Sequence, residues 1–135
     1  MKRKILYITR KVNLSIAHKL YNKKWSQEKN LEIFKKCSNC HGHNFTLHVT
    51  IKGEVDLESG MVANFSDLKD IINKEVSEKI DHKFLNNDVK EFDNIVTTSE
   101  NICLVIWDWL KPKLPNLYEV KLEETGNNST IYRGE

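Results

Sequence analysis

The clearest pattern along the chain is the alternation of apolar and polar residues over residues 44–55. Every second position there is apolar, at Phe45, Leu47, Val49 and Ile51. A period of two sends successive side chains to opposite faces of an extended backbone, which predicts a strand with one buried face. The turn-forming residues 56–60 that follow predict where this strand ends.

Other segments have the residue types of strands. Residues 5–14 mix β-branched and aromatic side chains, residues 117–125 alternate, and residues 130–133 predict a short last strand. Residues 25–34 are mostly polar and predict an excursion from the sheet that carries a short helix.

Two segments have helical periodicity. Residues 66–80 carry apolar side chains at a spacing of three to four, and Asn64 or Ser66 is placed to cap them. A second helix is expected after residues 97–100, whose hydroxyls and carboxylate suit a helix N-terminus, and Pro112 ends it. The element order is strand, strand, helix, helix, strand, strand. This order predicts an α+β fold, an antiparallel sheet with the helices on one face.

Glu124 occupies an unexpected position in the predicted strand 117–125. By parity it continues the apolar row of that strand, which consists of Tyr118, Val120 and Leu122. A carboxylate on a buried face needs a partner. That partner could be a ligand that donates two hydrogen bonds, or a buried Lys or Arg, and the residues alone favour neither.

Length and charge narrow the class of protein. The 135 residues fit one domain spanning residues 1–135, and a net charge of +2 gives no reason to expect a nucleic-acid partner. No apolar run approaches the ~20 residues of a membrane span, and the N-terminus has no signal-peptide pattern, so we expect a cytoplasmic protein without a membrane partner. The cysteine count of three is odd, which argues against a disulfide framework and favours metal binding or catalysis.

His41 and His43 are the strongest candidates for metal ligands. They are two residues apart, so in an extended backbone they point to the same side, and Gly42 between them leaves room for other groups. Two imidazoles presented in this way suit zinc, and three neutral ligands with one open position are typical of a catalytic site. His18 is the best third candidate. His48 is excluded because its odd offset from His43 places it on the opposite face.

A structural zinc knuckle is the alternative for this segment. Cys37 and Cys40 form a Cys-x-x-Cys pair that could join His41 or His43 in a closed four-ligand site, which would make the protein a binding module without catalysis. The spacing is compressed compared with that of zinc fingers, and no second pair lies ~12–20 residues away. We therefore favour the catalytic site.

Asp81 and His82 directly follow the first predicted helix. A carboxylate next to a histidine can orient the ring and raise its basicity, and the histidine could then keep a nearby cysteine ionised. Taken alone, two such residues after a helix are more often its C-terminal cap, with a histidine favoured by the helix dipole.

Taken in order, short motifs over nearly the whole chain resemble the 6-pyruvoyl-tetrahydropterin synthase / 6-carboxytetrahydropterin synthase family. Each motif alone is weak, whereas the ordered set is specific. The matching motifs are Ala17-His18, Cys37-x-x-x-His41-Gly42-His43-Asn44-Phe45, Gly53-Glu54-Val55-Asp56, Ser59-Gly60-Met61-Val62, Leu68-Lys69, Asp81-His82, Thr98-Ser99-Glu100-Asn101, Glu123-Glu124-Thr125 and Ile131-Tyr132-Arg133-Gly134-Glu135. Cys40 is an extra thiol beside the histidine pair, and it could compete as a ligand or as a base.

The resemblance implies a tunnelling fold. In this fold a four-stranded antiparallel sheet has two helices packed on one face, and subunits join their sheets into a barrel. The implied assembly is a homo-hexamer, a dimer of trimers, with active sites between subunits.

The resemblance also implies 7,8-dihydroneopterin triphosphate as substrate and assigns roles by position. The zinc ligands would be His18, His41 and His43. The general base would be Cys37, in a triad with Asp81 and His82. The pterin ring would be anchored by Glu124, in a pocket lined by Thr98, Ser99 and Glu100. Zinc would act as a Lewis acid on the substrate's side-chain hydroxyls.

Two features of the sequence favour different products. The three residues between Cys37 and His41 resemble the queuosine-branch enzymes, which form 6-carboxy-5,6,7,8-tetrahydropterin and release acetaldehyde. The long excursion between His18 and Cys37 is more similar to the tetrahydrobiopterin-branch enzymes, which form 6-pyruvoyl-tetrahydropterin. We give more weight to the motif spacing and predict the carboxy product, with the pyruvoyl product as the alternative. A pterin binder of the same family without activity is a third hypothesis.

Overall fold

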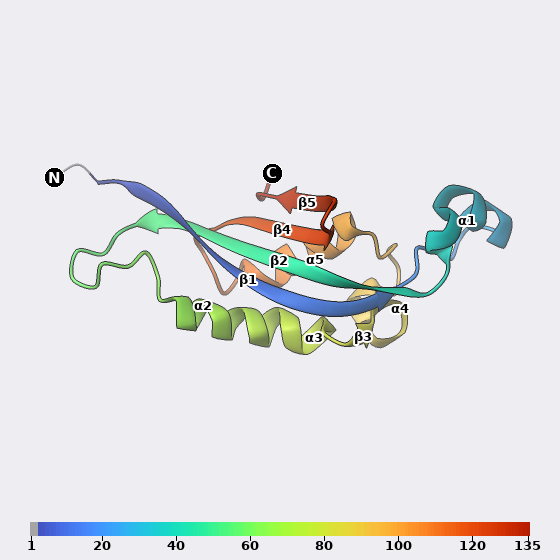
Figure 1. The fold of residues 1–135 in the computed structure, drawn as a ribbon, viewed down its shortest axis with the longest axis horizontal. Coiled ribbons are helices and arrows are strands. Elements are labelled where there is room, and N and C mark those ends of the chain that lie inside the picture. The colour runs from blue at the N-terminus through green and yellow to red at the C-terminus, as the bar shows by residue number, and fades with distance from the viewer. Residues whose placement is uncertain (1–2) are drawn as a thin grey trace.

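The structure, a computed structural model, describes residues 3–135, and it is built on one twisted sheet (Figure 1). The strand order in this sheet is β3-β1-β2-β4-β5. The strands are β1 (Ile5–His18), β2 (His41–Glu54), β3 (Lys83–Phe84), β4 (Leu117–Thr125) and β5 (Asn128–Tyr132). All neighbouring pairs are antiparallel except β1 and β3, which run parallel.

Strands β1 and β2 form a long antiparallel hairpin that crosses the whole molecule (Figure 1). The pairing starts at Ile5 opposite Glu54 and continues without a shift to His18 opposite His41. Both strands are longer than the sequence pattern predicts. Near His18 and His41 the residues are polar, and they still continue the backbone pairing of the two strands. There, Ser15 lies opposite Asn44, and their side chains are joined by a hydrogen bond of 3.0 Å.

Two helical segments cover the same face of the sheet. The first comprises α2 (Phe65–Ile72), a π-helical turn (Asn73–Ser77) and α3 (Glu78–Ile80), which follow one another as one rod in Figure 1. The second is α5 (Ser99–Leu110). Their apolar residues share one buried core with Leu14, Ile16, Phe45 and Leu47 of the hairpin. The predicted α+β architecture with helices on one face is confirmed.

The remaining helices are short and lie at the histidine end of the hairpin. These are α1 (Gln27–Phe34), a 3₁₀ turn (Lys35–Ser38), α4 (Leu85–Asp88) and a 3₁₀ turn (Lys90–Phe92). Helix α1 stands apart from the sheet, on the excursion that connects β1 to β2 (Figure 1). Within residues 3–135, no helix combines the length and the apolar character that a bilayer crossing requires.

Helix α2 begins with a side-chain cap. The Asn64 side chain accepts a hydrogen bond of 2.8 Å from the backbone N–H of Ser66, one of the N–H groups that a helix start leaves unpaired. We expect Asn64→Ala to lower the free energy of unfolding by about 1 kcal/mol. Urea denaturation followed by circular dichroism measures this difference. Asn94→Ala, at an exposed turn position outside any helix, is the control and should stay close to the parent.

Two details of the sheet differ from the sequence-based expectation. Strand β3 is a fifth strand where four were expected, and its length of two residues is too short for an alternation to show. Tyr118 does not continue the buried row of Val120 and Leu122. A register shift between Thr50 and Ile51 of the neighbouring strand marks a β-bulge, which reverses parity. The Tyr118 ring instead packs edge-on against that of Tyr7, 4.7 Å away between centroids.

Candidate metal centre and active site

Three histidines come together at the end of the hairpin. His18 lies directly opposite His41, and His43 lies opposite Ile16. Because paired residues on neighbouring strands share a face and alternate residues along a strand return to it, all three rings lie on the helix-covered face. His18 is buried, with 1% of its surface exposed. The hairpin register therefore gathers the three predicted ligands at one place.

Backbone carbonyls orient two of these rings. The Nδ1 atom of His18 is 2.6 Å from the carbonyl oxygen of Thr97, and the Nδ1 atom of His41 is 2.7 Å from that of Asn39. A carbonyl only accepts hydrogen bonds, so in each ring Nδ1 carries the proton. The lone pair of each neutral ring is then on Nε2, which is the arrangement found in metal-ligating histidines.

The other nitrogen of each ring, Nε2, lacks a partner in the part of the chain that the structure describes. Within residues 3–135, Nε2 of His18 and Nε2 of His41 are buried and have no hydrogen-bond partner. A buried acceptor without a partner costs about 1–3 kcal/mol, and native structures rarely leave one unexplained. Burial lowers the pKa of His18 and outweighs the opposite effect of its hydrogen bond to the Thr97 carbonyl, so the ring is neutral near pH 7. The rings are thus prepared to receive a cation.

Glu124 completes the group. Its Oε1 atom is 3.0 Å from Nε2 of His43 and 4.0 Å from Nε2 of His18, and its Oε2 atom accepts a hydrogen bond from the hydroxyl of Ser99. Each member of the group offers one ligand atom, and these atoms all lie within 4.8 Å of one another; the members are His18, His41, His43 and Glu124. Strand parity correctly placed Glu124 on the buried face. Its partners are a histidine and a hydroxyl, and within residues 3–135 it forms no ion pair with Lys or Arg.

The other candidate ligands lie outside this group. His48 faces Glu123 on the opposite side of the sheet, with 3.1 Å between Nε2 and Oε1, as its parity predicts. Neither Cys37 nor Cys40 belongs to a metal-binding group among the described residues. The zinc-knuckle alternative needs both thiols in the coordination sphere together with a histidine, and this geometry contradicts it.

The residues at the start of α5 differ in their relation to the site. Ser99 contacts Glu124 directly. Thr98 caps the helix, since its hydroxyl accepts from the N–H of Asn101, and Glu100 is exposed in the first turn. Sequence reasoning missed Thr97, which orients His18 through its backbone carbonyl. Every residue type has the same backbone carbonyl, so the sequence contains no signal for this contact.

Asp81 and His82 are held against the outer edge of β1. The backbone N–H of Ser15 donates to Oδ1 of Asp81 over 2.8 Å, and the N–H of His82 donates to the carbonyl of Ser15 over 2.7 Å. The same Oδ1 lies 3.1 Å from Nδ1 of His82. The carboxylate therefore orients the ring, as one of the two interpretations of the sequence predicts. Asp81 is also the C-cap of α3, so the other interpretation holds as well.

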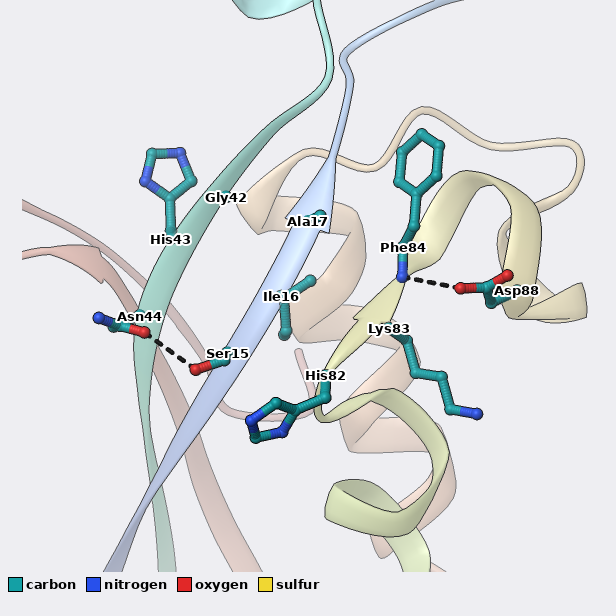
Figure 2. A pocket seen from close by; sticks show the side chains of 10 residues that line it. All are labelled: Ser15, Ile16, Ala17, Gly42, His43, Asn44, His82, Lys83, Phe84 and Asp88. Atoms are coloured by element: carbon teal, nitrogen blue, oxygen red, sulfur yellow. Dashed lines mark hydrogen bonds between the residues drawn. The ribbon is translucent and has the colours of Figure 1, made fainter.

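An open pocket of about 560 Å³ connects the two histidine-bearing regions. Its walls are residues 15–17 of β1, residues 42–44 of β2, and residues 82–84 with Asp88 (Figure 2). His43 and His82 both line it. A Cβ atom at Gly42 would contact only the carbonyl oxygen of Ile16, at 3.6 Å, so the strand itself does not require glycine here.

Cys37 lies four residues before His41, in the segment that leads into β2. It is half-buried in the 3₁₀ turn before β2, and its carbonyl accepts a hydrogen bond of 2.8 Å from the N–H of Leu20. Within residues 3–135, no hydrogen bond joins its thiol to Asp81 or His82. A single chain thus brings His18, His41, His43 and Glu124 together and pairs Asp81 with His82, but does not link Cys37 to that pair.

Comparison with known proteins identifies the family. The sequence model of 6-pyruvoyl tetrahydropterin synthase matches residues 7–135. The chain belongs to this family. The 6-pyruvoyl tetrahydrobiopterin synthase of Dictyostelium discoideum is 50% identical over 129 residues, covering 95% of this chain and 96% of the relative. The human protein of that name is 44% identical over 132 residues, covering 95% and 91%.

A solved structure agrees. The Caenorhabditis elegans 6-pyruvoyl tetrahydropterin synthase has a TM-score of 0.94 and 38% sequence identity, with 100% of both chains covered. The tunnelling fold of the 6-pyruvoyl tetrahydropterin synthase family is therefore that of this chain, which is a lyase of the family.

These relatives correct the predicted product. The spacing of three residues between Cys37 and His41 predicts the queuosine-branch product, 6-carboxy-5,6,7,8-tetrahydropterin, whereas the excursion before Cys37 favours the pyruvoyl branch. That prediction is wrong, because the relatives above bear the name of the pyruvoyl branch. The spacing sets how the chain turns from the 3₁₀ helix into β2, and this does not decide whether the substrate's carbon side chain is cleaved.

Proposed function

We propose that the protein converts 7,8-dihydroneopterin triphosphate into 6-pyruvoyl-tetrahydropterin and inorganic triphosphate, with zinc bound by His18, His41 and His43. The observation that carries this proposal is the pair of buried Nε2 atoms beside Glu124, which have no hydrogen-bond partner among residues 3–135, in a chain whose relatives bear the name of this synthase. The reaction needs no external oxidant or reductant. The substrate loses triphosphate and otherwise only redistributes its own hydrogen atoms.

The donor set fits zinc. Three neutral imidazole nitrogens with a free fourth position match catalytic zinc sites, and nitrogen ligands suit zinc better than they suit calcium or magnesium. Bound zinc would polarise the substrate's side-chain hydroxyls and so acidify the hydrogens on and next to them. The carbonyls of Thr97 and Asn39 hold the first two rings in the tautomer that leaves Nε2 free.

Glu124 is proposed to bind the pterin ring. The pterin's amino-pyrimidine edge presents two N–H donors, and a carboxylate accepts such a pair through both oxygens. Ser99 holds one carboxylate oxygen in place, and His43 holds the other only while its Nε2 is not a metal ligand. Ligation of His43 would therefore release the Glu124 oxygen that faces it. Thr98 and Glu100 are proposed to line the same pocket.

Cys37 is proposed as the general base, with the pair Asp81 and His82 from a second copy of the chain. Within one chain the thiol has no hydrogen bond to that pair, whereas His82 is exposed and lines an open pocket together with His43. An active site formed between subunits would place Cys37 of one chain beside Asp81 and His82 of another. The homo-hexamer made of two trimers is proposed on the same ground, and the cytoplasm is the proposed location of the protein.

The role of Glu124 can be separated from that of the metal. We expect Glu124→Gln to raise KM by about 10–100-fold, because the amide loses the charge and one acceptor, and a hydrogen bond to a charged group is worth roughly 1.5–3 kcal/mol. Zinc content should not change. Steady-state kinetics and zinc analysis of the purified variant measure both quantities.

Glu123→Gln is the matched control for this substitution. The Glu123 carboxylate lies on the opposite face of β4 and pairs with His48, so its kinetics should match the parent. Zinc loss from Glu124→Gln would contradict pterin binding and make Glu124 a fourth metal ligand.

The product decides the function. The purified protein should be incubated with 7,8-dihydroneopterin triphosphate and zinc, and the products should be identified by mass spectrometry under anaerobic conditions. We expect 6-pyruvoyl-tetrahydropterin and triphosphate. Acetaldehyde with a 6-carboxy product would overturn the proposal, and so would bound substrate without turnover, which would make the protein a pterin binder.

A further inference from the structure

Cys37 and Cys40 occupy the two ends of one turn. Cys37 and Ser38 lie in the 3₁₀ helix Lys35–Ser38, and Asn39 is extended, with φ −91° and ψ 152°. A helical residue followed by an extended one is the centre of a type VIII β-turn, in which the first and fourth Cα atoms come within about 7 Å. Disulfides span Cα separations of about 4.4–6.8 Å. A turn of this kind therefore keeps the two cysteines near the upper limit of the disulfide range.

The surroundings of the two thiols allow them to react. In the single chain Cys40 is exposed and Cys37 is half-buried, so an oxidant can reach Cys40 from solvent. Neither thiol belongs to the metal group of the described residues. Cys103 is different, since it is fully buried on the inner face of α5 and burial raises its thiol pKa to about 11. One chain therefore contains two neighbouring accessible or half-buried thiols and a buried reference thiol.

We infer that Cys37 and Cys40 form a reversible intramolecular disulfide that switches the enzyme off. The oxidant is a small-molecule disulfide such as glutathione disulfide. The Cys40 thiolate attacks it and releases one thiol, and Cys37 then displaces the second thiol from the mixed disulfide. Two cysteine thiols are oxidised, and one small disulfide is reduced to two thiols.

The consequence for activity rests on the proposed function, in which Cys37 is the base. A sulfur bonded to another sulfur cannot accept a proton from the substrate, so the oxidised enzyme should lose the whole contribution of the base. The metal ligands are untouched by this chemistry, and zinc should stay bound.

The test equilibrates the zinc-loaded enzyme in glutathione buffers from fully reduced to fully oxidised, then measures turnover and blocks free thiols with iodoacetamide after denaturation. Trypsin releases residues 37–52 as one peptide that contains both cysteines. Oxidation should remove two hydrogens from this peptide and prevent its alkylation, while Cys103 remains alkylated. Turnover should fall about 10²–10⁴-fold with zinc content unchanged, and dithiothreitol should restore it.

Cys40→Ser is the matched variant, because it keeps Cys37 and removes only its partner. It should turn over substrate like the parent. It should also remain active at ratios of oxidised to reduced glutathione that inactivate the parent. Three results would overturn the inference: alkylation of both cysteines at every ratio, a glutathione adduct in place of the internal bond, or an internal bond that leaves turnover unchanged. Absence of turnover in the fully reduced enzyme would instead refute the proposed function, while the peptide mass would still decide whether the bond forms.

Discussion

Cys37→Ala is expected to lower the turnover of 7,8-dihydroneopterin triphosphate by about 10²–10⁴-fold, the usual contribution of a positioned general base. Alanine removes the only group of residue 37 that can accept a proton, and it leaves the carbonyl that Leu20 binds. The fold should therefore persist. Single-turnover kinetics at saturating substrate measure the chemical step directly and avoid any contribution from product release.

The same variant separates catalysis from metal binding. Zinc should remain at the parent stoichiometry, since Cys37 lies outside the group of His18, His41, His43 and Glu124. Cys40→Ala removes a thiol from the same turn and serves as control, with turnover close to that of the parent. If Cys37→Ala were to release zinc, the thiol would be a ligand, and the assignment of the base would have to be abandoned.

His41→Ala is expected to remove zinc and activity together. Loss of an outer partner of a ligand costs metal sites about 10–100-fold in affinity, and loss of the ligand itself should exceed that range. Zinc affinity can be measured by competition with a chromophoric chelator, and the thermal midpoint should stop rising with added zinc, because a metal that binds only the native state stabilises it.

His48→Ala is the matched control for this experiment. It removes an imidazole from the same strand on the opposite face, where its partner is Glu123. Zinc affinity and turnover should be those of the parent. Equal zinc losses in His41→Ala and His48→Ala would mean that the rings act through the stability of β2 and not as ligands, which the proposed site does not allow.

Parity along the strands was the most informative sequence signal. It separated His43 from His48 and placed Glu124 on the face of Val120 and Leu122. The pairing of β1 with β2 is regular over residues 43–48, and so is that of β2 with β4 over residues 120–123. Parity failed for Tyr118, where a bulge inserts one residue, since a bulge depends on the neighbouring strand and leaves no periodic signal.

Features that depend on contacts between distant segments were beyond the sequence pattern. Strand β3 exists because Asp81 and His82 bond to the backbone of Ser15, and two residues carry no period. The hydrogen bond between Glu124 and Ser99 joins β4 to α5, and the sequence of neither segment predicts this contact. The product also could not be inferred, because spacing between motifs describes the path of the chain and not the fate of the substrate.

The carbonyl of Thr97 has a consequence for how this metal centre can change during evolution. Every residue has a backbone carbonyl, so a substitution at the exposed Asn39, or one at the buried position 97 that keeps the hydrogen bond to the Lys19 carbonyl, leaves the acceptor of the neighbouring ring in place. A deletion or insertion before α5 would instead move the carbonyl away from His18. The orientation of the ligands should therefore tolerate sequence drift in these loops, while the lengths of the loops stay under strict selection.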